Sequence, residues 1–226
     1  MSLRSVKPPH ETRTRILDAA EELFMQHGFG GTSMRQLTAK AGVNLAAVNY
    51  HFGSKDALIE AVFRRRLDPM NAGRIAELDR LEKAAAGALS PEAIIRAFVG
   101  ASLRMIEDAK CGGRNFIRLL GRTYTDPHKQ IRALIGQLYA PTMERFKNAF
   151  ERSLPQMPRD ELVWRIHFMF GTLAYTLAAT DTVQLIAGCK PEDRYDARLL
   201  EARLTAFLAA GLLAPLHNAA DVKKAA

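Results

Sequence analysis

Apolar residues recur every three or four positions along most of this chain, which is the spacing of amphipathic α-helices. Alternating apolar and polar residues, the pattern of strands, are nearly absent, so an all-α protein is predicted. The first helix carries one apolar stripe and is predicted to end at Gly28. The capping-box pattern Ser33-x-x-Gln36 opens a second short helix. Gly42 ends that helix, and Asn44 caps a third.

A fourth helix is predicted to begin at Ser54, and Asp68-Pro69 marks a kink or interruption in it, because proline has no amide hydrogen. That region is the candidate joint between two domains. Ser90-Pro91 is a strong helix start, since proline is favoured at the first helical position. The remaining helices are expected from 91 to about 111, from 115 to 125, from 126 toward 154, from 160 to 187 and from 196 to about 213.

The composition predicts an anionic partner, and it gives no sign of a disulfide scaffold or of a metal site. The chain has 226 residues, 48% of them hydrophobic, which is enough for a substantial core. Its formal net charge of +8 favours an anionic partner, most commonly phosphate, although a merely basic protein carries the same charge. Cys111 and Cys189 do not suggest a disulfide scaffold. The six histidines show no paired ligand spacing, so no metal site is predicted.

No membrane-spanning segment is expected. The longest uncharged run, from Ile166 to Thr180, is shorter than the roughly 20 residues that a span requires, and we interpret it as a buried helix. The first nine residues lack an apolar signal core and are expected to form a flexible basic arm. Together with the two separate cysteines, these features predict a cytoplasmic protein.

Residues 32–55 carry the most informative pattern, two short helices that meet at Gly42. This arrangement is typical of a helix-turn-helix unit, which presents one helix end to the DNA major groove. Ser33 and Lys55 lie at helix N-termini, where they can bind phosphate. Asn49 can pair with adenine, and small residues at 46 and 47 allow close approach to the groove. The alternative is an ordinary helical hairpin with polar caps.

Three motifs of this region have a characteristic spacing and residue type: Gly28-Phe29-x-x-Thr32-Ser33, Ala41-Gly42-Val43-Asn44 and His51-Phe52-Gly53-Ser54-Lys55-x-Ala57-Leu58. Together they resemble the N-terminal domain of the TetR family of transcriptional regulators, over roughly residues 10–66. The resemblance implies an all-helical homodimer. Each subunit would have a three-helix DNA-binding head and a helical body that senses a small molecule, which usually induces release from DNA.

The resemblance and the helix pattern divide the chain into four parts. Residues 1–9 form the basic arm, and residues 10–66 form the helix-turn-helix domain. Residues 67–216 form the ligand-binding and dimerisation domain, and residues 217–226 form a frayed tail.

Residue by residue, the resemblance implies phosphate contacts for Ser33 and Lys55 and a base or phosphate contact for Arg35. The family commonly has a tyrosine where this chain has Asn49, and here the tyrosine is displaced to Tyr50. Asn49 is therefore a candidate base reader. The predicted DNA-binding residues are Ser33, Arg35, Asn44, Leu45, Ala46, Ala47, Asn49, Tyr50 and Lys55.

The segment from Val43 to Lys55 is also similar to that of a TetR subgroup that includes regulators of fatty-acid β-oxidation. That similarity implies a long-chain fatty acid or its acyl-CoA as effector. The body is rich in Phe and Met, which are adaptable linings for an acyl chain, although most such residues simply form core. Arg114, Arg118 and Arg122 recur four residues apart and can hold an anionic head group; the alternative is a solvated basic stripe. The predicted ligand-binding residues are Phe98, Met105, Phe116, Arg118, Arg122, Tyr139, Met143, Phe146, Phe168 and Met169.

The last two long helices suggest a dimer interface. One has a face of small residues and the other an apolar face, so two such helices from each subunit can form a four-helix interface. The alternative is that both faces pack within the subunit. The predicted interface residues are Gly171, Thr172, Ala174, Ala178, Leu200, Leu204, Phe207 and Leu208.

Motifs of catalysis are missing: the chain has no Gly-x-Ser-x-Gly, no His-Glu-x-x-His and no phosphate-binding loop. We therefore expect no enzyme activity and no cofactor. The prediction is a homodimeric repressor that binds a pseudo-palindromic operator in double-stranded DNA and is released by a fatty acid or acyl-CoA. One alternative is a TetR-type repressor of a drug efflux pump. Another is a helical lipid carrier or enzyme that does not bind DNA.

Overall fold

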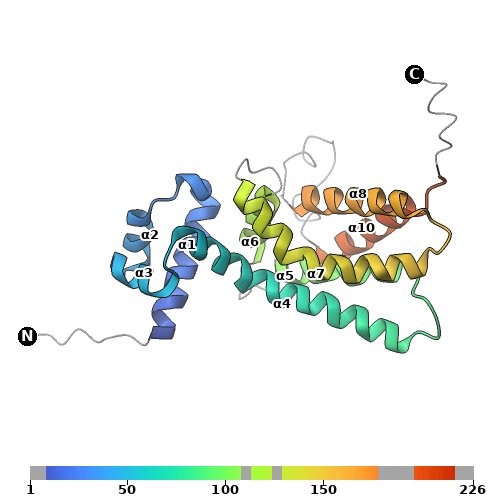
Figure 1. Ribbon diagram of the computed structural model, residues 1–226, viewed down its shortest axis with the longest axis horizontal. Helices are drawn as coiled ribbons and strands as arrows, with labels where there is room; N and C mark the ends of the chain where they lie inside the picture. Colours follow the sequence, from blue (N-terminus) through green and yellow to red (C-terminus); the bar gives the residue numbers. More distant parts are fainter. Residues whose placement is uncertain (1–8, 108–112, 124–128, 178–195, 217–226) are drawn as a thin grey trace, which may run out of the picture.

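The computed structural model describes residues 9–107, 113–123, 129–177 and 196–216, and in these ranges every regular element is an α-helix (Figure 1). The helices form a small head at one end of an elongated molecule and a larger body at the other (Figure 1). The head contains α1 (Pro9–Gly31), α2 (Met34–Ala41) and α3 (Leu45–Phe52). The long helix α4 (Lys55–Ala84) leads from the head into the body. The body continues with α5 (Pro91–Glu107), α6 (Gly113–Thr123), α7 (Lys129–Ser153), α8 (Arg159–Leu177) and α10 (Ala197–Leu212).

The predicted helix caps are confirmed. Ser33 and Gln36 form the capping box of α2. The Asn44 side chain accepts from the Ala47 amide at 2.8 Å, and the Ser54 hydroxyl accepts from the Ala57 amide at 3.1 Å. The Asp196 carboxylate accepts from the Leu199 amide at 2.9 Å. Each cap satisfies an amide that has no partner inside its helix, which explains why such local signals locate helix starts well.

The backbone leaves the helical conformation at Gly28, as predicted, with φ of 74° and ψ of 174°. Glycine tolerates this positive φ without the steric penalty that a β-carbon would add. Helical residues follow up to Gly31, so α1 ends slightly later than predicted. Thr32 comes next, buried, and its hydroxyl donates to the carbonyl oxygens of Leu23 at 3.2 Å and Gly28 at 2.8 Å.

The predicted interruption at Asp68-Pro69 is wrong. Helix α4 runs from Lys55 to Ala84 with Pro69 inside it, and it therefore passes through the expected boundary between residues 66 and 67. An interior proline costs about 3 kcal/mol. The neighbouring side chains of Leu67 and Met70 are buried in the core, and each contributes about 1.5–3 kcal/mol, which offsets that penalty.

The core is continuous from the head into the body. In the head the ring of Phe29 lies between those of Phe24 and Phe63, with centroid distances of 5.3 and 5.8 Å. The ring of Phe63 in α4 then packs against that of Phe116 in α6, with a centroid distance of 6.0 Å. Helix α6 also packs directly against α1 and against α8. The head is thus joined to the body both through α4 and through α6.

Within the described body, the helices follow the predicted order, and α10 packs mainly against α5. A short loop that contains Pro155 and Pro158 separates α7 from α8, between the helices predicted to end near 154 and to begin at 160. Residues 178–187 of the predicted penultimate helix lie outside the described residues, as do the predicted arm, apart from Pro9, and the predicted tail. None of the helices that the structure describes is long and apolar enough to cross a membrane.

Candidate nucleic-acid interface and effector pocket

The turn between α2 and α3 is built around Gly42, whose φ of 61° lies in the left-handed region. Its amide donates to the carbonyl oxygen of Ala39 at 3.3 Å. The guanidinium of Arg15 in α1 donates to the carbonyl oxygens of Ala41 and Gly42, the latter at 2.9 Å. Arg15 therefore holds the turn against α1 and fixes the direction in which α3 leaves it.

Helix α3 has one buried and one exposed face. Val48 is 1% exposed and packs into the core of the head, whereas Tyr50 is 84% and Leu45 50% exposed. Ala46 and Asn49 are exposed as well. Positions 45, 46, 49 and 50 share one side of an α-helix, so they form a continuous outward face. The amide of Asn49 on this face is accessible to a base edge.

The two residues predicted to bind phosphate, Ser33 and Lys55, lie at the starts of α2 and α4, the helices on either side of α3 in the sequence. Ser33 is the exposed N-cap of α2, and its hydroxyl accepts from the Gln36 amide at 3.2 Å. Lys55, the first residue of α4, donates from Nζ to the carbonyl oxygen of Thr32 at 2.6 Å. This bond brings an ammonium group next to the N-terminus of α2, where the helix dipole also favours an anion.

The other predicted residues of this face differ in their surroundings. Arg35 is exposed in the first turn of α2. Asn44 is exposed, but its side-chain oxygen is occupied in capping α3, and Ala47 is half-buried. The structure therefore gathers all nine predicted residues at one end of the head, on α2, on α3 and at the start of α4 (Figure 1). Asn44 and Ala47 mainly shape α3.

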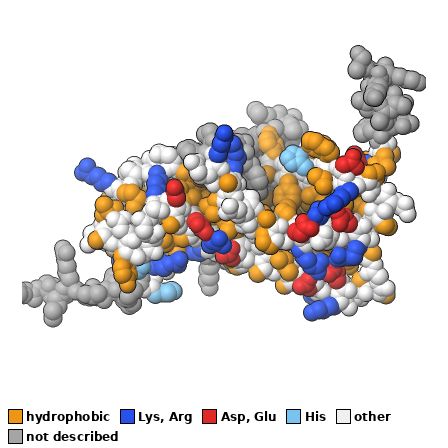
Figure 2. All heavy atoms as spheres, in the orientation of Figure 1, with side chains coloured by type: hydrophobic (Ala, Val, Ile, Leu, Met, Phe, Trp, Pro, Cys, Tyr) orange, Lys and Arg blue, Asp and Glu red, His pale blue; other side chains and the backbone are white. Residues whose placement is uncertain are grey.

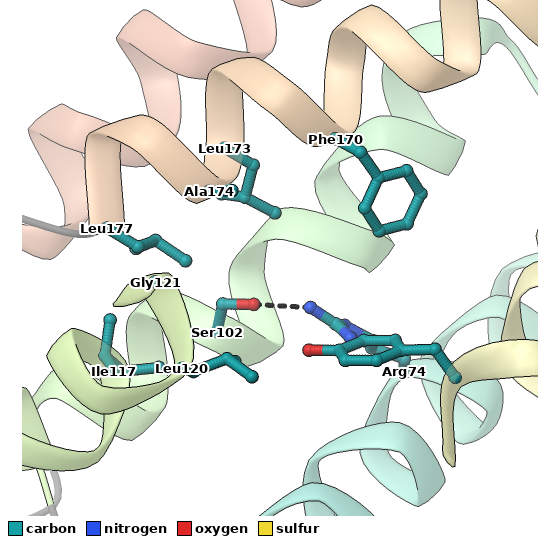
Figure 3. Close-up of a pocket in the computed structure, with 10 residues that line it drawn as sticks. Arg74, Ser102, Ile117, Leu120, Gly121, Phe170, Leu173, Ala174 and Leu177 are labelled. Carbon is teal, nitrogen blue, oxygen red and sulfur yellow. Dashed lines mark hydrogen bonds between the residues drawn. The ribbon is translucent and has the colours of Figure 1, made fainter. Parts of the chain in front are cut away.

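The body contains a buried charge that we did not predict from the sequence. Arg74 in α4 is only 1% exposed. Its Nε donates to the Phe98 carbonyl oxygen at 3.0 Å, its Nη1 to Asn71 Oδ1 at 3.0 Å and its Nη2 to Ser102 Oγ at 2.5 Å (Figure 3). The guanidinium carbon lies 3.8 Å from the centroid of the Phe98 ring and 5.4 Å from that of Tyr139. All of these partners are neutral.

One cavity adjoins Arg74, and a second cavity shares two lining residues with the first. The larger one, of about 270 Å³, lies between α6, α7 and α8, and the smaller one, of about 10 Å³, lies beside Arg74. Tyr139 and Phe170 line both cavities, and their ring centroids are 6.4 Å apart. The other residues of the larger cavity are Thr123, Arg132, Ile135, Gly136 and Met143, and those of the smaller are Arg74, Ser102, Ile117, Leu120, Gly121, Leu173, Ala174 and Leu177.

Some of the predicted ligand-binding residues lie at these cavities. Tyr139 lines both, Met143 lines the larger one, and Phe98 lies under the Arg74 guanidinium. Phe168 is instead 61% exposed on the outside of α8 and lines neither cavity. The side chains of Arg118 and Arg122 lie outside the described part of the structure. The remaining predicted residues are buried in the core without lining these cavities: Met105, Phe116, Phe146 and Met169.

A sequence signal for Arg74 exists in retrospect. Along α4, the buried residues Leu67, Met70, Arg74 and Leu78 follow one another at intervals of three, four and four, so Arg74 falls on the same helical face as the three apolar residues. A charged residue at an apolar position of a stripe indicates a buried charge. The segment also has acidic and basic residues on either side of Arg74, as an exposed helix surface has, so its composition does not distinguish Arg74 from a surface residue.

Apolar side chains cover much of the outer surface of α8 and α10, and some are visible over α8 in Figure 2. Phe207, a predicted interface residue, is 67% exposed, and Gly171 is exposed as well. Leu204 and Leu208 are instead buried on the inner face of α10, which packs against α5 of the same subunit, as in the alternative in which these faces pack within the subunit. Thr172, Ala174 and Leu200 are half-buried, and Ala178 lies outside the described residues. The exposed large apolar residues of these helices are Val163, Trp164, Phe168, Tyr175, Leu199 and Phe207.

Two family models match this chain and establish the family to which it belongs. The family model described as "Bacterial regulatory proteins, tetR family" matches residues 16–62, and the model described as "Tetracyclin repressor-like, C-terminal domain" matches residues 96–211, just over half of the chain. The chain belongs to the TetR family. It is therefore a DNA-binding transcriptional regulator of the TetR type, with a helix-turn-helix head and a helical body. Among the residues described, no group of three or more His, Cys, Asp or Glu side chains is placed to hold a metal ion.

The head also matches curated TetR-type relatives. The chain is 37% identical over 70 residues to the HTH-type transcriptional regulator SrpR from Pseudomonas putida, a match that covers 31% of this chain and 33% of SrpR. The match thus spans only about a third of that relative.

The whole fold is similar to solved structures of low sequence identity. The fatty acid degradation regulator FadR from Bacillus halodurans matches with a TM-score of 0.64 and 14% identity, over 89% of this chain and 96% of that one. FadR from Bacillus subtilis in complex with stearoyl-CoA matches with a TM-score of 0.62 and 14% identity, over 90% and 99%. At this identity the similarity establishes a shared TetR fold.

Proposed function

We propose that this TetR-family regulator is a homodimeric repressor that a long-chain fatty acid or its acyl-CoA releases from a pseudo-palindromic operator. The exposed face of α3 is the observation that carries the DNA-binding part. A helix whose residues 45, 46, 49 and 50 all point outward, with an amide and a phenol among them, fits the major groove. Ser33 and Lys55 would bind the phosphates on either side and set the register of α3 on the duplex.

The exposed apolar surface of α8 and α10 supports the dimer. Trp164, Phe168 and Phe207 are each more than half exposed, and a surface rich in large apolar side chains marks a binding surface in soluble proteins. Two copies that bury this surface around a two-fold axis would present two α3 helices to successive major grooves, about 34–36 Å apart.

The lipid part of the proposal is supported by the larger cavity. Its lining is mostly apolar, with Tyr139, Met143 and Phe170 as adaptable aromatic and thioether walls. Two structural neighbours are FadR proteins, one of them solved with stearoyl-CoA. A drug cation would require a buried carboxylate, and the residues that line the two cavities include arginines and no Asp or Glu.

The experiment that tests this proposal starts with selection of bound sequences from random duplexes. Fluorescence anisotropy on the selected operator is then measured with palmitate, palmitoyl-CoA and a lipophilic drug cation. We expect operator affinity to fall by at least about tenfold with a lipid ligand, which corresponds to a coupling free energy above about 1.4 kcal/mol. Release by the cation alone would favour an efflux-pump repressor. If no duplex is selected, the lipid-carrier or enzyme alternative gains instead.

A further inference from the structure

The buried guanidinium of Arg74 has no counterion among the residues that the structure describes. Arginine stays protonated at every physiological pH, so this position carries a full positive charge. The partners of Arg74 are a backbone carbonyl oxygen, the Asn71 amide and the Ser102 hydroxyl. A charge buried with only neutral partners is energetically expensive, and proteins retain such a group mainly where an anion meets it.

The partners also hold the guanidinium in one orientation. Three of its five N–H groups are used, one on each nitrogen, which leaves one N–H on each Nη. Asn71, which accepts from Nη1, donates its own amide to the carbonyl oxygen of Leu138 at 3.1 Å. The network thus connects α4 with α5 and α7 and leaves the two terminal nitrogens as a preformed fork for a carboxylate.

The fork adjoins the smaller cavity, whose other walls are apolar. Leu173 and Leu177 of α8 and Ile117 and Leu120 of α6 surround the space that Arg74 and Ser102 border (Figure 3). Tyr139 and Phe170 line both this space and the larger cavity. Rotation of these two rings would join the cavities into one apolar channel that ends at a positive charge.

We infer that Arg74 binds the carboxylate of the effector, so that the ligand enters acid-first and its apolar part extends past Tyr139 into the larger cavity. This inference rests on the proposed function. It restricts the ligand from a fatty acid or its acyl-CoA to a ligand with a free carboxylate. An acyl-CoA is a thioester with no free carboxylate, and its large polar nucleotide part does not fit beside Arg74. The ligand is therefore an apolar monocarboxylic acid in its free form.

The charge of the ligand can be tested with the unmodified protein. Isothermal titration calorimetry compares palmitate with its methyl ester, with hexadecanol and with palmitoyl-CoA. We expect palmitate to bind at least about tenfold more tightly than the ester or the alcohol, because only the acid can form a charged hydrogen-bonded pair. Equal affinities for acid and ester, preference for palmitoyl-CoA, or binding of none of these ligands and of no other apolar acid would overturn the inference.

The residue is tested with Arg74→Gln, which keeps hydrogen-bond donors and loses the charge. We expect palmitate affinity to fall by at least about tenfold and the difference between acid and ester to disappear. Arg96→Gln, which is exposed on α5 and lines neither cavity, is the matched control and is expected to keep that difference. Wild-type discrimination in a folded Arg74→Gln variant would assign the carboxylate to another group. If that variant does not fold, Arg74→Lys replaces it. Lysine keeps the charge without the fork, so palmitate affinity and the difference between acid and ester are both expected to fall there as well.

The lipid proposal and the Arg74 inference can fail separately. A second ligand series of short aromatic and branched carboxylic acids is measured for operator release. Release by one of these acids, lost in Arg74→Gln, would support Arg74 as the carboxylate ligand and contradict the long-chain lipid. Release by palmitoyl-CoA that is unchanged in Arg74→Gln would support the lipid and contradict the role of Arg74.

Discussion

Lys55 and Arg74 lie on one continuous helix, α4, so the candidate phosphate ligand of the head and the buried charge of the body are parts of the same element. At a rise of about 1.5 Å per residue, their Cα atoms are separated by about 28 Å along the helix axis. A ligand that shifts α4 at Arg74 would therefore also shift the start of α4 beside α3. The contact of Phe63 with Phe116 adds a second connection, because α6 packs against α1.

Phe116→Leu is predicted to weaken the coupling between effector and operator. The substitution shortens the side chain that contacts Phe63 and leaves the lining of both cavities intact. The fold is expected to lose about 1 kcal/mol, and the ratio of operator affinities without and with saturating effector is expected to decrease. Anisotropy titrations give this ratio. Phe150→Leu, equally buried in α7, is the control, and equal ratios in both variants would contradict the prediction.

Asn49→Ala is predicted to weaken and broaden operator recognition. If the amide makes a paired contact to an adenine, its loss costs about 1–3 kcal/mol, or about 5- to 150-fold in affinity at that base. Binding to a scrambled duplex should change little, because it depends on phosphate contacts. Competition titrations with single-base operator variants locate the base. Gln137→Ala, exposed on α7, is the control, and an Asn49→Ala variant with full specificity would remove Asn49 as a reader.

Whether a feature of this molecule can be predicted from the sequence depends on how far apart in the chain its interacting residues lie. The caps at Ser33, Asn44 and Ser54 need only residues three positions away, and all were predicted. The effect of Pro69 was predicted wrongly, because burial of side chains on both sides of it by distant helices decides whether α4 continues. A local rule includes the proline penalty and omits that packing.

The body shows the same limit at the level of single residues. Periodicity marks Phe168 and Phe98 equally as apolar, but one is exposed on α8 and the other is fully buried under a guanidinium. Leu204 and Leu208 share a helix with Phe207 and face the opposite way, into the subunit. The network of Arg74 joins residues of α4, α5 and α7 that are far apart in the sequence, so no local pattern predicts its partners.

Lys55→Gln is predicted to lower both operator affinity and its dependence on salt. Log affinity falls linearly with log salt concentration, and each phosphate that a cation neutralises makes this slope steeper by about 0.9. The variant should therefore have a slope that is shallower by about one such increment. Because Nζ also donates to the Thr32 carbonyl oxygen, the melting temperature is measured in parallel. Lys147→Gln in α7 is the control. An unchanged salt slope in a folded Lys55→Gln variant would show that this ammonium binds no phosphate.

Phe207→Glu is predicted to dissociate the dimer. The ring is largely exposed in the subunit, so a charge there is tolerated in a monomer, whereas burial of that charge in an interface would be strongly unfavourable. Light scattering coupled to size-exclusion chromatography measures the mass, and operator affinity should fall because two heads no longer bind together. Ala133→Glu, exposed on α7, makes the same change of charge elsewhere. A Phe207→Glu variant that keeps the wild-type mass would place the interface on another surface.

Glu82 is predicted to stabilise the body at neutral pH and to lose this effect in acid. Hydrogen bonds from Arg145 are the main cause that lowers the pKa of Glu82, with a smaller contribution from Arg152. These contacts join the end of α4 to α7, with Arg152 Nη2 at 2.5 Å from Glu82 Oε1 and Arg145 Nη2 at 2.7 Å from Asp79 Oδ1. Because the carboxylate form is favoured in the folded state, its contribution is present above the pKa of an unfolded Glu, about 4.3, and is lost as the pH falls through the lower folded pKa.

Glu82→Gln should therefore be less stable than the wild type at pH 7 by about 1 kcal/mol, a value reduced by the partial solvent exposure of the cluster. Urea unfolding at pH 7, 5, 4 and 3 should show this difference narrowing as the pH falls below about 4.3, the pKa of an unfolded Glu, because the unfolded carboxylate is then protonated before the folded one. Glu22→Gln is the control, because Glu22 pairs with Lys40 and accepts from Gln26 at an exposed site, where such contacts contribute little. A difference for Glu82→Gln that stays constant down to pH 3 would mean that its cause is packing rather than charge.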